Sequence, residues 1–547
     1  MAASATARLR SSKNVRQMAT QNGHGGDGKG ERGGGRGGVK KRSGGNSRGH
    51  RDQLRDLIHN ATTPEEILCA IRKFPLKKLS QVHIREAFTK LTKVRVNWRD
   101  CPIIFADDER FQGVLRRALG LVSEDQFDAR SVATIMYSLA KLHQTRKLNA
   151  NRSPALIELW DALDSGAIRV ASEMNSQEVA NTVWGYAKLE RQPGDETWRA
   201  LEASAKRVAP EMNSQNVANT VWGYATLGRQ PGDETWRALE TSAKRVAPEM
   251  NSQEVANTVW GYATLSTLQG TEMSSSSTLL WEMAREMKVE DISDQSLQML
   301  FHTQLMIKDF MITVDGSHNN ELDPLWLTVD ARSAWMQSTR DEVSVSQSQK
   351  ALARIIGELG FRYKMEHLSS DNYFSFDIYL PDHDVAVEFD GPFHFLHASD
   401  RARDKNTVLT KNGSTKLRDL FLAKRCSRLL TVPYFEWQNL NTSEMRRNYV
   451  REKLEKEGGI NVMTTAADVA TEVGEQLSMP KHSEEKENVK KKDDEAPLDV
   501  NDKVGVISGI HVNKSGVIVK RTAKKFNLTL EGGKSTSLNH GAVVRRS

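Results

Sequence analysis

Residues 174–189 read MNSQEVANTVWGYAKL, and this stretch recurs almost unchanged from Met212 and again from Met250. A fixed spacing of 38 residues is typical of proteins built from stacked structural repeats. Weaker copies extend the series in both directions, at residues 79–94, 127–142 and 292–307. The sequence therefore predicts six repeat units.

Each unit has the pattern of two helices. Apolar residues from Val179 onward recur at helical spacing, and Asn175 is suited to cap the start of this first helix. A Pro-Gly pair at 193–194 then interrupts the chain, and Asp195 is expected to cap a second helix. Because such a pair cannot close its own core, neighbouring units must stack. Residues 54–344 are thus predicted to form an α-solenoid.

Length and composition restrict the class of protein. A chain of 547 residues is too long for one domain, and no apolar run approaches the ~18 residues of a membrane span. We therefore expect no membrane contact. The three cysteines, Cys69, Cys101 and Cys426, are too far apart for a CxxC-type zinc site, which favours a reducing compartment.

Charge is unevenly distributed along the chain. Residues 1–53 contain 12 basic and 3 acidic side chains, residues 54–344 contain 33 and 39, and residues 498–547 contain 9 and 3. The two ends are basic, whereas the predicted solenoid is mildly acidic. No acidic residue precedes Asp27, a composition that suits an organellar transit peptide or an ordinary disordered terminus.

A Gly-rich arm follows this terminus and carries RGG-type triplets at Arg32 and Arg36. Glycine-rich chain buries too little apolar surface to fold, so we expect a cationic disordered arm. Such arms bind phosphate backbones without sequence preference. A solvated linker without a binding role is the alternative.

The pattern changes near residue 345, where an α/β domain is predicted to begin and to extend to residue 455. Helices are expected at 346–359, 417–424 and 443–454, and strands at 373–380, 385–390 and 428–432. Residues 456–497 then read as a charged linker. Period-two patterning over 498–547 predicts a small all-β barrel.

Residues 346–454 resemble a RAP domain, a module of organellar RNA-metabolism proteins that include the FAST-kinase-domain family. The resemblance lies in FDI at 376–378, VAVEFDGPFHF at 385–395, GSTKLR at 413–418 and LTVPYFEW at 430–437. It implies RNA binding and a restriction-endonuclease-like α/β fold.

Two further segments resemble known modules. The 38-residue units are similar to octotricopeptide repeats, although they lack the PPPEW signature of typical members. Residues 502–509 and 514–518 are similar to a KOW module, which implies contact with RNA or a ribosomal surface.

Three carboxylates are predicted to share one face of the α/β sheet. If residues 381–384 form a turn, Leu380 pairs with Val385, and Asp377 lies opposite Glu388. Asp390 is on the same face. Because like charges destabilise such a pair, a cation must compensate. The candidates are Mg²⁺, which could activate water for phosphodiester cleavage, or the side chain of Lys416 or Arg418.

The resemblance does not carry over a complete catalytic site. Nuclease relatives of the fold have Glu-x-Lys on the second strand, whereas here Asp390 stands in the third position, so Lys416 would have to substitute. His394 could carry a proton or could be a packed core residue. We favour a non-catalytic site without a cofactor, and Mg²⁺ belongs only to the nuclease alternative.

Residues suited to RNA binding occur in both regions. Asn181, Asn219 and Asn257 recur at one position of the repeat and could pair with bases, or else link adjacent units. In the α/β domain, aromatic and basic residues could stack on bases and meet phosphates, although Trp437 also fits a core position. These residues are Arg401, Arg403, Lys405, Lys411, Lys416, Arg418, Tyr434 and Trp437.

The sequence therefore predicts a monomeric RNA-binding protein of the mitochondrial matrix, or alternatively of the chloroplast. Its partner would be single-stranded organellar mRNA or rRNA, and its role processing, stability or translation. One alternative is a metal-dependent endoribonuclease that uses Asp377, Glu388 and Asp390. Another is a ribosome-associated scaffold, in which the acidic solenoid binds a basic protein.

Overall fold

The computed structural model describes residues 48–94, 105, 107–144, 148, 154–310, 323–340, 345–397 and 409–461, and strands between 503 and 545. The predicted transit-like segment, the Gly/Arg-rich arm and most of the charged linker lie outside these residues. The chain divides into two compact units, residues 1–463 and 464–547. None of the helices within the described ranges is long and apolar enough to cross a membrane.

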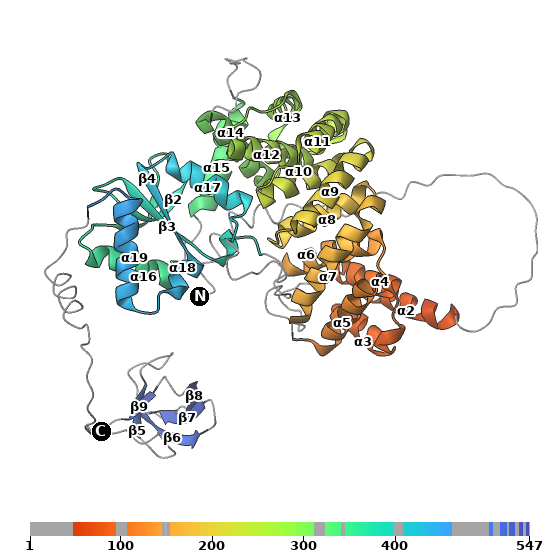
Figure 1. Ribbon diagram of the computed structural model, residues 1–547, viewed down its shortest axis with the longest axis horizontal. Coiled ribbons are helices and arrows are strands. Elements are labelled where there is room, and N and C mark those ends of the chain that lie inside the picture. Colours follow the sequence, from red (N-terminus) through yellow and green to blue (C-terminus); the bar gives the residue numbers. More distant parts are fainter. Residues whose placement is uncertain are drawn as a thin grey trace, which may run out of the picture. The chain divides into compact units, whose positions relative to one another are not determined.

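Helix pairs fill most of the first unit and form two layers (Figure 1). The A layer consists of α4 (Gln81–Lys93), α6 (Ala129–Gln144), α8 (Ser176–Lys188), α10 (Ser214–Leu227), α12 (Ser252–Gln269) and α14 (Asp294–Phe310). The B layer consists of α5 (Glu109–Ser123), α7 (Pro154–Val170), α9 (Asp195–Val208), α11 (Asp233–Val246) and α13 (Ser275–Arg285). Each predicted repeat contains one A helix, so the series of helical repeats is confirmed.

The helices begin largely where the sequence predicted. Asn175 accepts a hydrogen bond from the main-chain N–H of Glu178, and Glu178 reciprocates, which completes a capping box at α8. The expected cap of α9 is displaced by one residue. Gly194 occupies the cap position, and Asp195 is the first helical residue, where its charge still complements the helix dipole.

Small residues let the A helices approach one another closely. A Cβ added to Gly223 would lie 2.8 Å from Val183 Cγ1, and one added to Gly261 would lie 2.8 Å from Val221 Cγ1. Both distances are too short for carbon atoms in contact. The conserved spacing of glycine within the unit therefore sets how tightly α8, α10 and α12 pack.

Arginines near the ends of B helices bond back to the start of their own unit. Arg207 donates to the carbonyl oxygen of Met174 at 2.6 Å, and Arg245 repeats this bond to Met212 at 2.6 Å. Their guanidinium groups satisfy main-chain carbonyls that precede the A helix of the same unit, which stabilises each helix pair.

The α/β domain follows the repeats and contains a four-stranded sheet in the order β1-β2-β3-β4. Strands β1 (Lys364–Leu368), β2 (Ser375–Leu380) and β3 (Val385–Asp390) are antiparallel neighbours, and β4 (Arg428–Pro433) runs parallel to β3. The helices are α16 (Gln347–Glu358), α17 (Gly413–Ala423), α18 (Tyr434–Asn439) and α19 (Ser443–Lys456).

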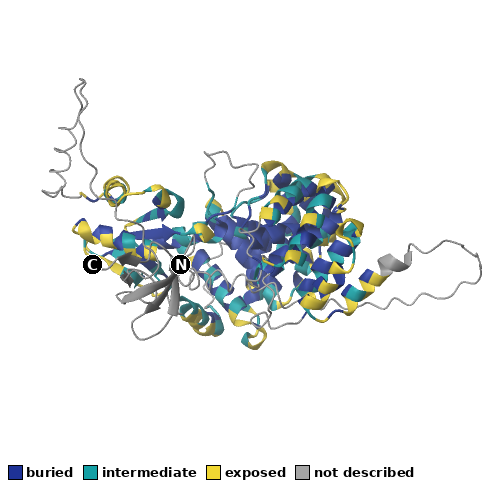
Figure 2. Ribbon diagram, turned by 90° about the horizontal axis from the view of Figure 1, so that it is seen from below, coloured by how far each residue is buried: buried dark blue, intermediate teal, exposed yellow. Residues whose placement is uncertain are grey.

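The two faces of this sheet belong to different cores. On one face, Val387 and Phe389 pack with Ile356 and Leu454 of α16 and α19. On the other face lies α17, whose Phe421 belongs to the same continuous core as the repeats. Buried residues consequently run through both the helical layers and the sheet (Figure 2). The repeats thus complete the second face of the sheet.

The second unit contains five strands in an antiparallel sheet of order β8-β7-β6-β5-β9. They are β5 (Lys503–Val506), β6 (Ser515–Arg521), β7 (Lys525–Leu530), β8 (Ser535–Asn539) and β9 (Val543–Arg545). The predicted short strands are present, whereas closure into a barrel remains a prediction.

Candidate nucleic-acid interface

The predicted pairing of carboxylates on β2 and β3 occurs in the structure. Leu380 lies opposite Val385, which sets Asp377 beside Glu388. The main-chain N–H of Asp377 donates to Glu388 Oε1 at 2.7 Å, and that of Phe389 donates to Asp377 Oδ2 at 2.9 Å. Asp377 and Glu388 are 0% and 3% exposed. Both carboxylates are therefore engaged inside the domain.

Basic side chains compensate the remaining negative charge. Arg418 Nη2 lies 2.9 Å from Glu388 Oε2, and Lys411 Nζ lies 2.7 Å from Asp390 Oδ2. Burial opposes ionisation of Asp390, but the hydrogen bond and charge of His394, together with the charge of Lys411, hold its pKa below the ordinary value. These cations remove the like-charge repulsion.

Lys416 does not take part in this compensation. Its Nζ donates to the carbonyl oxygen of Gly228 at 3.2 Å, and burial lowers its pKa. Residues two apart on a helix are separated by about 200°. Lys416 therefore points to the repeats, whereas Arg418 on the same helix reaches the sheet and Glu388.

This donor set does not fit a divalent metal. Asp377, Glu388 and Asp390 are nearly fully buried, and at least one oxygen of each already accepts a main-chain or cationic partner. Within the described residues, no group of three or more His, Cys, Asp or Glu side chains is arranged to hold a metal ion. We derive no hydrolytic step from these carboxylates.

Helix α17 joins the α/β domain to the repeats at a very close main-chain contact. A Cβ on Gly413 would lie 1.9 Å from the carbonyl oxygen of Ala225 and 2.9 Å from the nitrogen of Gly228. Gly228 itself ends α10 with φ of 65°, a conformation that favours glycine. Only glycine fits at both positions.

The contact continues along α17 and the segment before it. The ring of His302 on α14 packs at a tilt against the rings of Trp335 and Phe421, with ring centroids 4.7 Å and 5.1 Å away. The main-chain N–H of His397 donates to the carbonyl oxygen of Glu190, at the end of α8. The α/β domain therefore contacts the repeats from α8 to α14.

The three repeated asparagines occupy the face of the A layer that points away from the B layer, here called the A face. Tyr186 of α8 donates to Asp164 of α7 at 2.6 Å, which fixes the B-facing side of α8. Asn181, five residues earlier, is rotated by about 140° from Tyr186. Its counterparts Asn219 and Asn257 hold the same position on α10 and α12.

Two of the three asparagines, Asn181 and Asn219, are half-buried, so their amides are accessible to a ligand. Asn257 is 6% exposed and is buried in this structure. None of their side chains hydrogen-bonds to another residue in the described part of the chain, and Oδ1 of Asn257 is buried without a partner there. A ladder of asparagines that links adjacent units is therefore not formed among the described residues.

Tryptophans beside the asparagines pack between repeats. Trp184, Trp222 and Trp260 are at most 3% exposed. Lys188 Nζ lies 4.1 Å from the ring centroid of Trp222, and Trp260 Nε1 donates to His302 Nδ1 at 3.2 Å. The rings support the face and are not open for base stacking.

The remaining candidates fall into two groups. Trp437 is 3% exposed and meets Phe389 edge to face, so it is a core residue. Tyr434 is half-buried beside Phe395. The other candidates, Arg32, Arg36, Arg401, Arg403 and Lys405, lie outside the described residues.

Several residues that build this region were not singled out from the sequence. Arg425, Gly228 and His302 all join the α/β domain to the repeats, but each acts on a partner more than 50 residues distant. The one local signal was glycine after an apolar helical run at Gly228, which predicts a helix end and not a docking point.

Fold and site together describe a helical-repeat protein whose last repeats carry an α/β domain. The sequence model of the RAP domain matches residues 387–453. That of a protein of unknown function (DUF1601) matches residues 165–183, 201–221 and 243–259, each at the junction of a B helix and the next A helix. No curated protein matches the chain. The chain is a RAP domain-containing protein with helical repeats.

Proposed function

We propose that this protein binds single-stranded RNA along the A face and through its RAP domain. RAP domains in general bind RNA, which supports the class of ligand. The observation that carries the proposal is the row of amides at Asn181, Asn219 and Asn257. They repeat at 38 residues, share one face and make no hydrogen bond within the described residues.

The chemistry of this row suits bases. An amide donates and accepts at once, so it can pair with the edge of an unstacked base. Solenoids that read RNA use one repeat per base, with two or three polar side chains in register. Because the three units are almost identical in sequence, they should prefer the same base at successive positions.

Charge at the ends would add affinity without adding specificity. Residues 1–53 and 498–547 are strongly basic, and the arm carries Arg32 and Arg36. Phosphate contacts release counterions, so binding should weaken steeply as salt rises. Because the repeats complete one face of the RAP sheet, RNA binding must be measured on the whole chain.

The test compares binding of the four RNA homopolymers by fluorescence anisotropy, with the whole chain at two salt concentrations. The double variant Asn181→Ala, Asn219→Ala should bind the preferred homopolymer at least tenfold more weakly, with a smaller loss of affinity for the other three. Asn60→Ala, at an exposed asparagine that ends α2 (Arg48–Asn60), is the matched control outside the RAP domain and should bind as the parent does. Equal loss for all four homopolymers, or no loss, would reject base contact by the A face.

We further propose that this binding serves organellar mRNA or rRNA processing, stability or translation. The Arg- and Lys-containing N-terminus without early acidic residues supports a mitochondrial matrix location, with the chloroplast as the alternative. A fluorescent protein preceded by residues 1–53 should enter the organelle. Its retention outside both organelles would reject this part of the proposal.

A further inference from the structure

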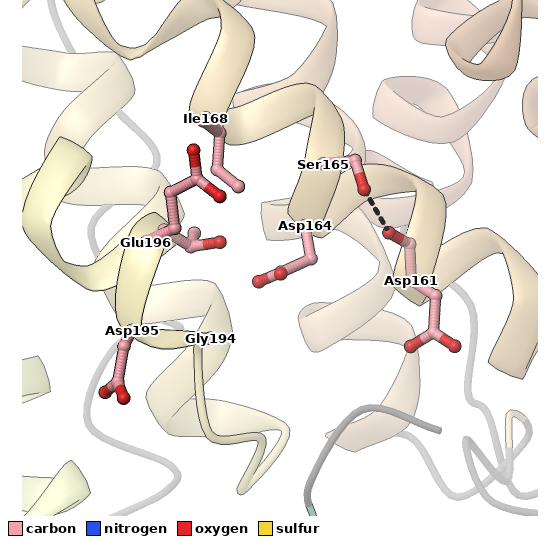
Figure 3. Close-up of a pocket in the computed structure, with 8 residues that line it drawn as sticks. Asp161, Asp164, Ser165, Ile168, Gly194, Asp195 and Glu196 are labelled. Carbon is pink, nitrogen blue, oxygen red and sulfur yellow. Dashed lines mark hydrogen bonds between the residues drawn. The ribbon is translucent and has the colours of Figure 1, made fainter. Parts of the chain in front are cut away.

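A cavity of about 240 Å³ lies between α7 and the start of α9, on the B layer and away from the A face (Figure 3). The carboxylates of Asp164 and Glu196 point into the space between these helices, whereas Asp195 points away from it. Ile168 lies beside Glu196. The lining is completed by Asp161, Ser165, Gly194, Asp195 and Thr197.

Polar oxygens gather above Gly194 in this cavity. Asp164 Oδ2 lies 3.3 Å, and Thr197 Oγ1 3.8 Å, from the point that a Cβ on Gly194 would occupy. Thr197 is fully buried, and its hydroxyl has no hydrogen-bond partner among the described residues. Burying a hydroxyl without a hydrogen-bond partner costs free energy, so a group outside the described residues is expected to bond to it.

The next junction of the solenoid, between α9 and α11, has a lysine that the α7–α9 junction lacks. There Lys206 pairs with Glu234, the counterpart of Glu196. Between α7 and α9 the residue equivalent to Lys206 is Ile168, which carries no charge. Glu196 therefore lacks the ammonium group that its counterpart has.

Asp164 and Thr197 also lack the hydrogen bonds that their counterparts make at the next junction. Glu202 accepts a hydrogen bond from the main-chain N–H of Gly232, and the Thr235 hydroxyl donates to the carbonyl oxygen of Glu202 at 3.3 Å. Their counterparts are Asp164, which is one methylene shorter, and Thr197. Asp164 Oδ1 accepts from Tyr186, which leaves Oδ2 facing the cavity.

From this comparison we infer that the cavity binds the side-chain ammonium group of a lysine on a partner protein. The ammonium group would donate to Asp164 Oδ2, Glu196 and the Thr197 hydroxyl, while Ile168 contacts the methylenes of the lysine. The residues 54–344 carry a net negative charge, which attracts a basic partner. Binding here is independent of RNA binding at the A face.

Ile168→Lys is the decisive variant, because it supplies from within the chain the lysine that the next junction already has. The whole chain is titrated by calorimetry with an acetylated, amidated peptide of alternating glycine and lysine. Ile168→Lys should weaken binding of the peptide at least tenfold, whereas Ile168→Leu should leave that binding unchanged. Both variants should keep the parent melting temperature, because Lys206 and Glu234 show that the pair fits this fold.

Two further arms define the chemistry and its source. The same peptide with acetylated lysines should not bind, since it lacks the ammonium charge. Spermidine should compete with the lysine peptide, because both carry ammonium groups. If spermidine binds and Ile168→Lys weakens that binding, but the peptide does not bind, the ammonium group does not come from a partner protein. Equal binding by the parent and Ile168→Lys chains would overturn the site itself.

Discussion

The guanidinium group of Arg425 and the carboxylate of Asp309 form an ion pair at 2.7 Å that links the RAP domain to the last A helix. The same guanidinium donates from Nε to Asp371 Oδ2 at 2.7 Å, within the RAP domain. The Arg425 side chain is only 8% exposed. One arginine thus holds two carboxylates from two different parts of the chain.

Arg425→Ala should destabilise the whole first unit by about 3 kcal/mol, because it leaves two partly buried carboxylates without their cation. Arg425→Lys should lose about half as much, since an ammonium group cannot reproduce the planar contact with both. Urea unfolding followed by circular dichroism measures both. Wild-type stability of Arg425→Ala would show that the ion pair does not hold the two regions together.

Gly413→Ala should separate the RAP domain from the repeats, because the added Cβ would overlap the carbonyl oxygen of Ala225. We expect a melting temperature lowered by several degrees and faster proteolysis between residues 340 and 413. Gly120→Ala is the control. Gly120 lies in the last turn of α5 with only Arg117 near its Cβ position, so this substitution should raise stability by about 0.5–1 kcal/mol.

Burial of His302, with a smaller contribution from the charge of Arg425, lowers its pKa to about 3. The ordinary value is 6.5, so the unfolded chain binds more protons between these two pH values. Stability should be full above pH 6.5 and should fall by up to about 1.4 kcal/mol per pH unit below it. His302→Gln keeps an acceptor for Trp260 but cannot titrate, so its urea midpoint should fall less with pH. Parallel pH profiles for parent and variant would contradict this assignment.

Asn257→Leu should separate stability from function. Removing a buried amide whose oxygen has no partner should leave stability unchanged or raise it by about 1 kcal/mol. Affinity for the preferred RNA homopolymer should nevertheless fall. Thermal melting and anisotropy on one preparation check both outcomes. A large loss of stability would show that the amide serves packing.

Removal of divalent metal should change neither stability nor RNA affinity. Arg418 and Lys411 already neutralise Glu388 and Asp390, so the carboxylates need no metal ion. EDTA should leave the melting temperature within one degree, and addition of Mg²⁺ should produce no cleavage of labelled RNA. Cleavage that Glu388→Ala abolishes would restore the nuclease hypothesis.

The repeats and most of the sheet could be predicted from sequence because their signals are local. The near-identical units from Met174 fixed the A helices, and a four-residue turn after Leu380 fixed the register of Asp377 with Glu388. Strand β1 (Lys364–Leu368) was missed because it lies half-buried at a sheet edge and lacks clear alternation.

The docking of α17 could not be predicted, because it depends on atoms brought together from distant parts of the chain. Lys416 and Arg418 are close in sequence and equally basic, yet the helix turns them to different partners. The cavity beside Asp164 was also not anticipated. Its lining differs from the next junction because Asp164 and Ile168 replace Glu202 and Lys206, and this difference matters only once the helices are packed.

The contacts of the RAP domain with the ends of α8, α10 and α14 have a consequence for how the gene can change. Repeat proteins commonly gain or lose whole units, since each unit touches only its neighbours. Here a unit inserted between α8 and α14 would move His397, Gly413 and Arg425 away from their partners. Copy number is therefore free to vary only before α8, so any lengthening of the series of repeats must occur at its N-terminal side.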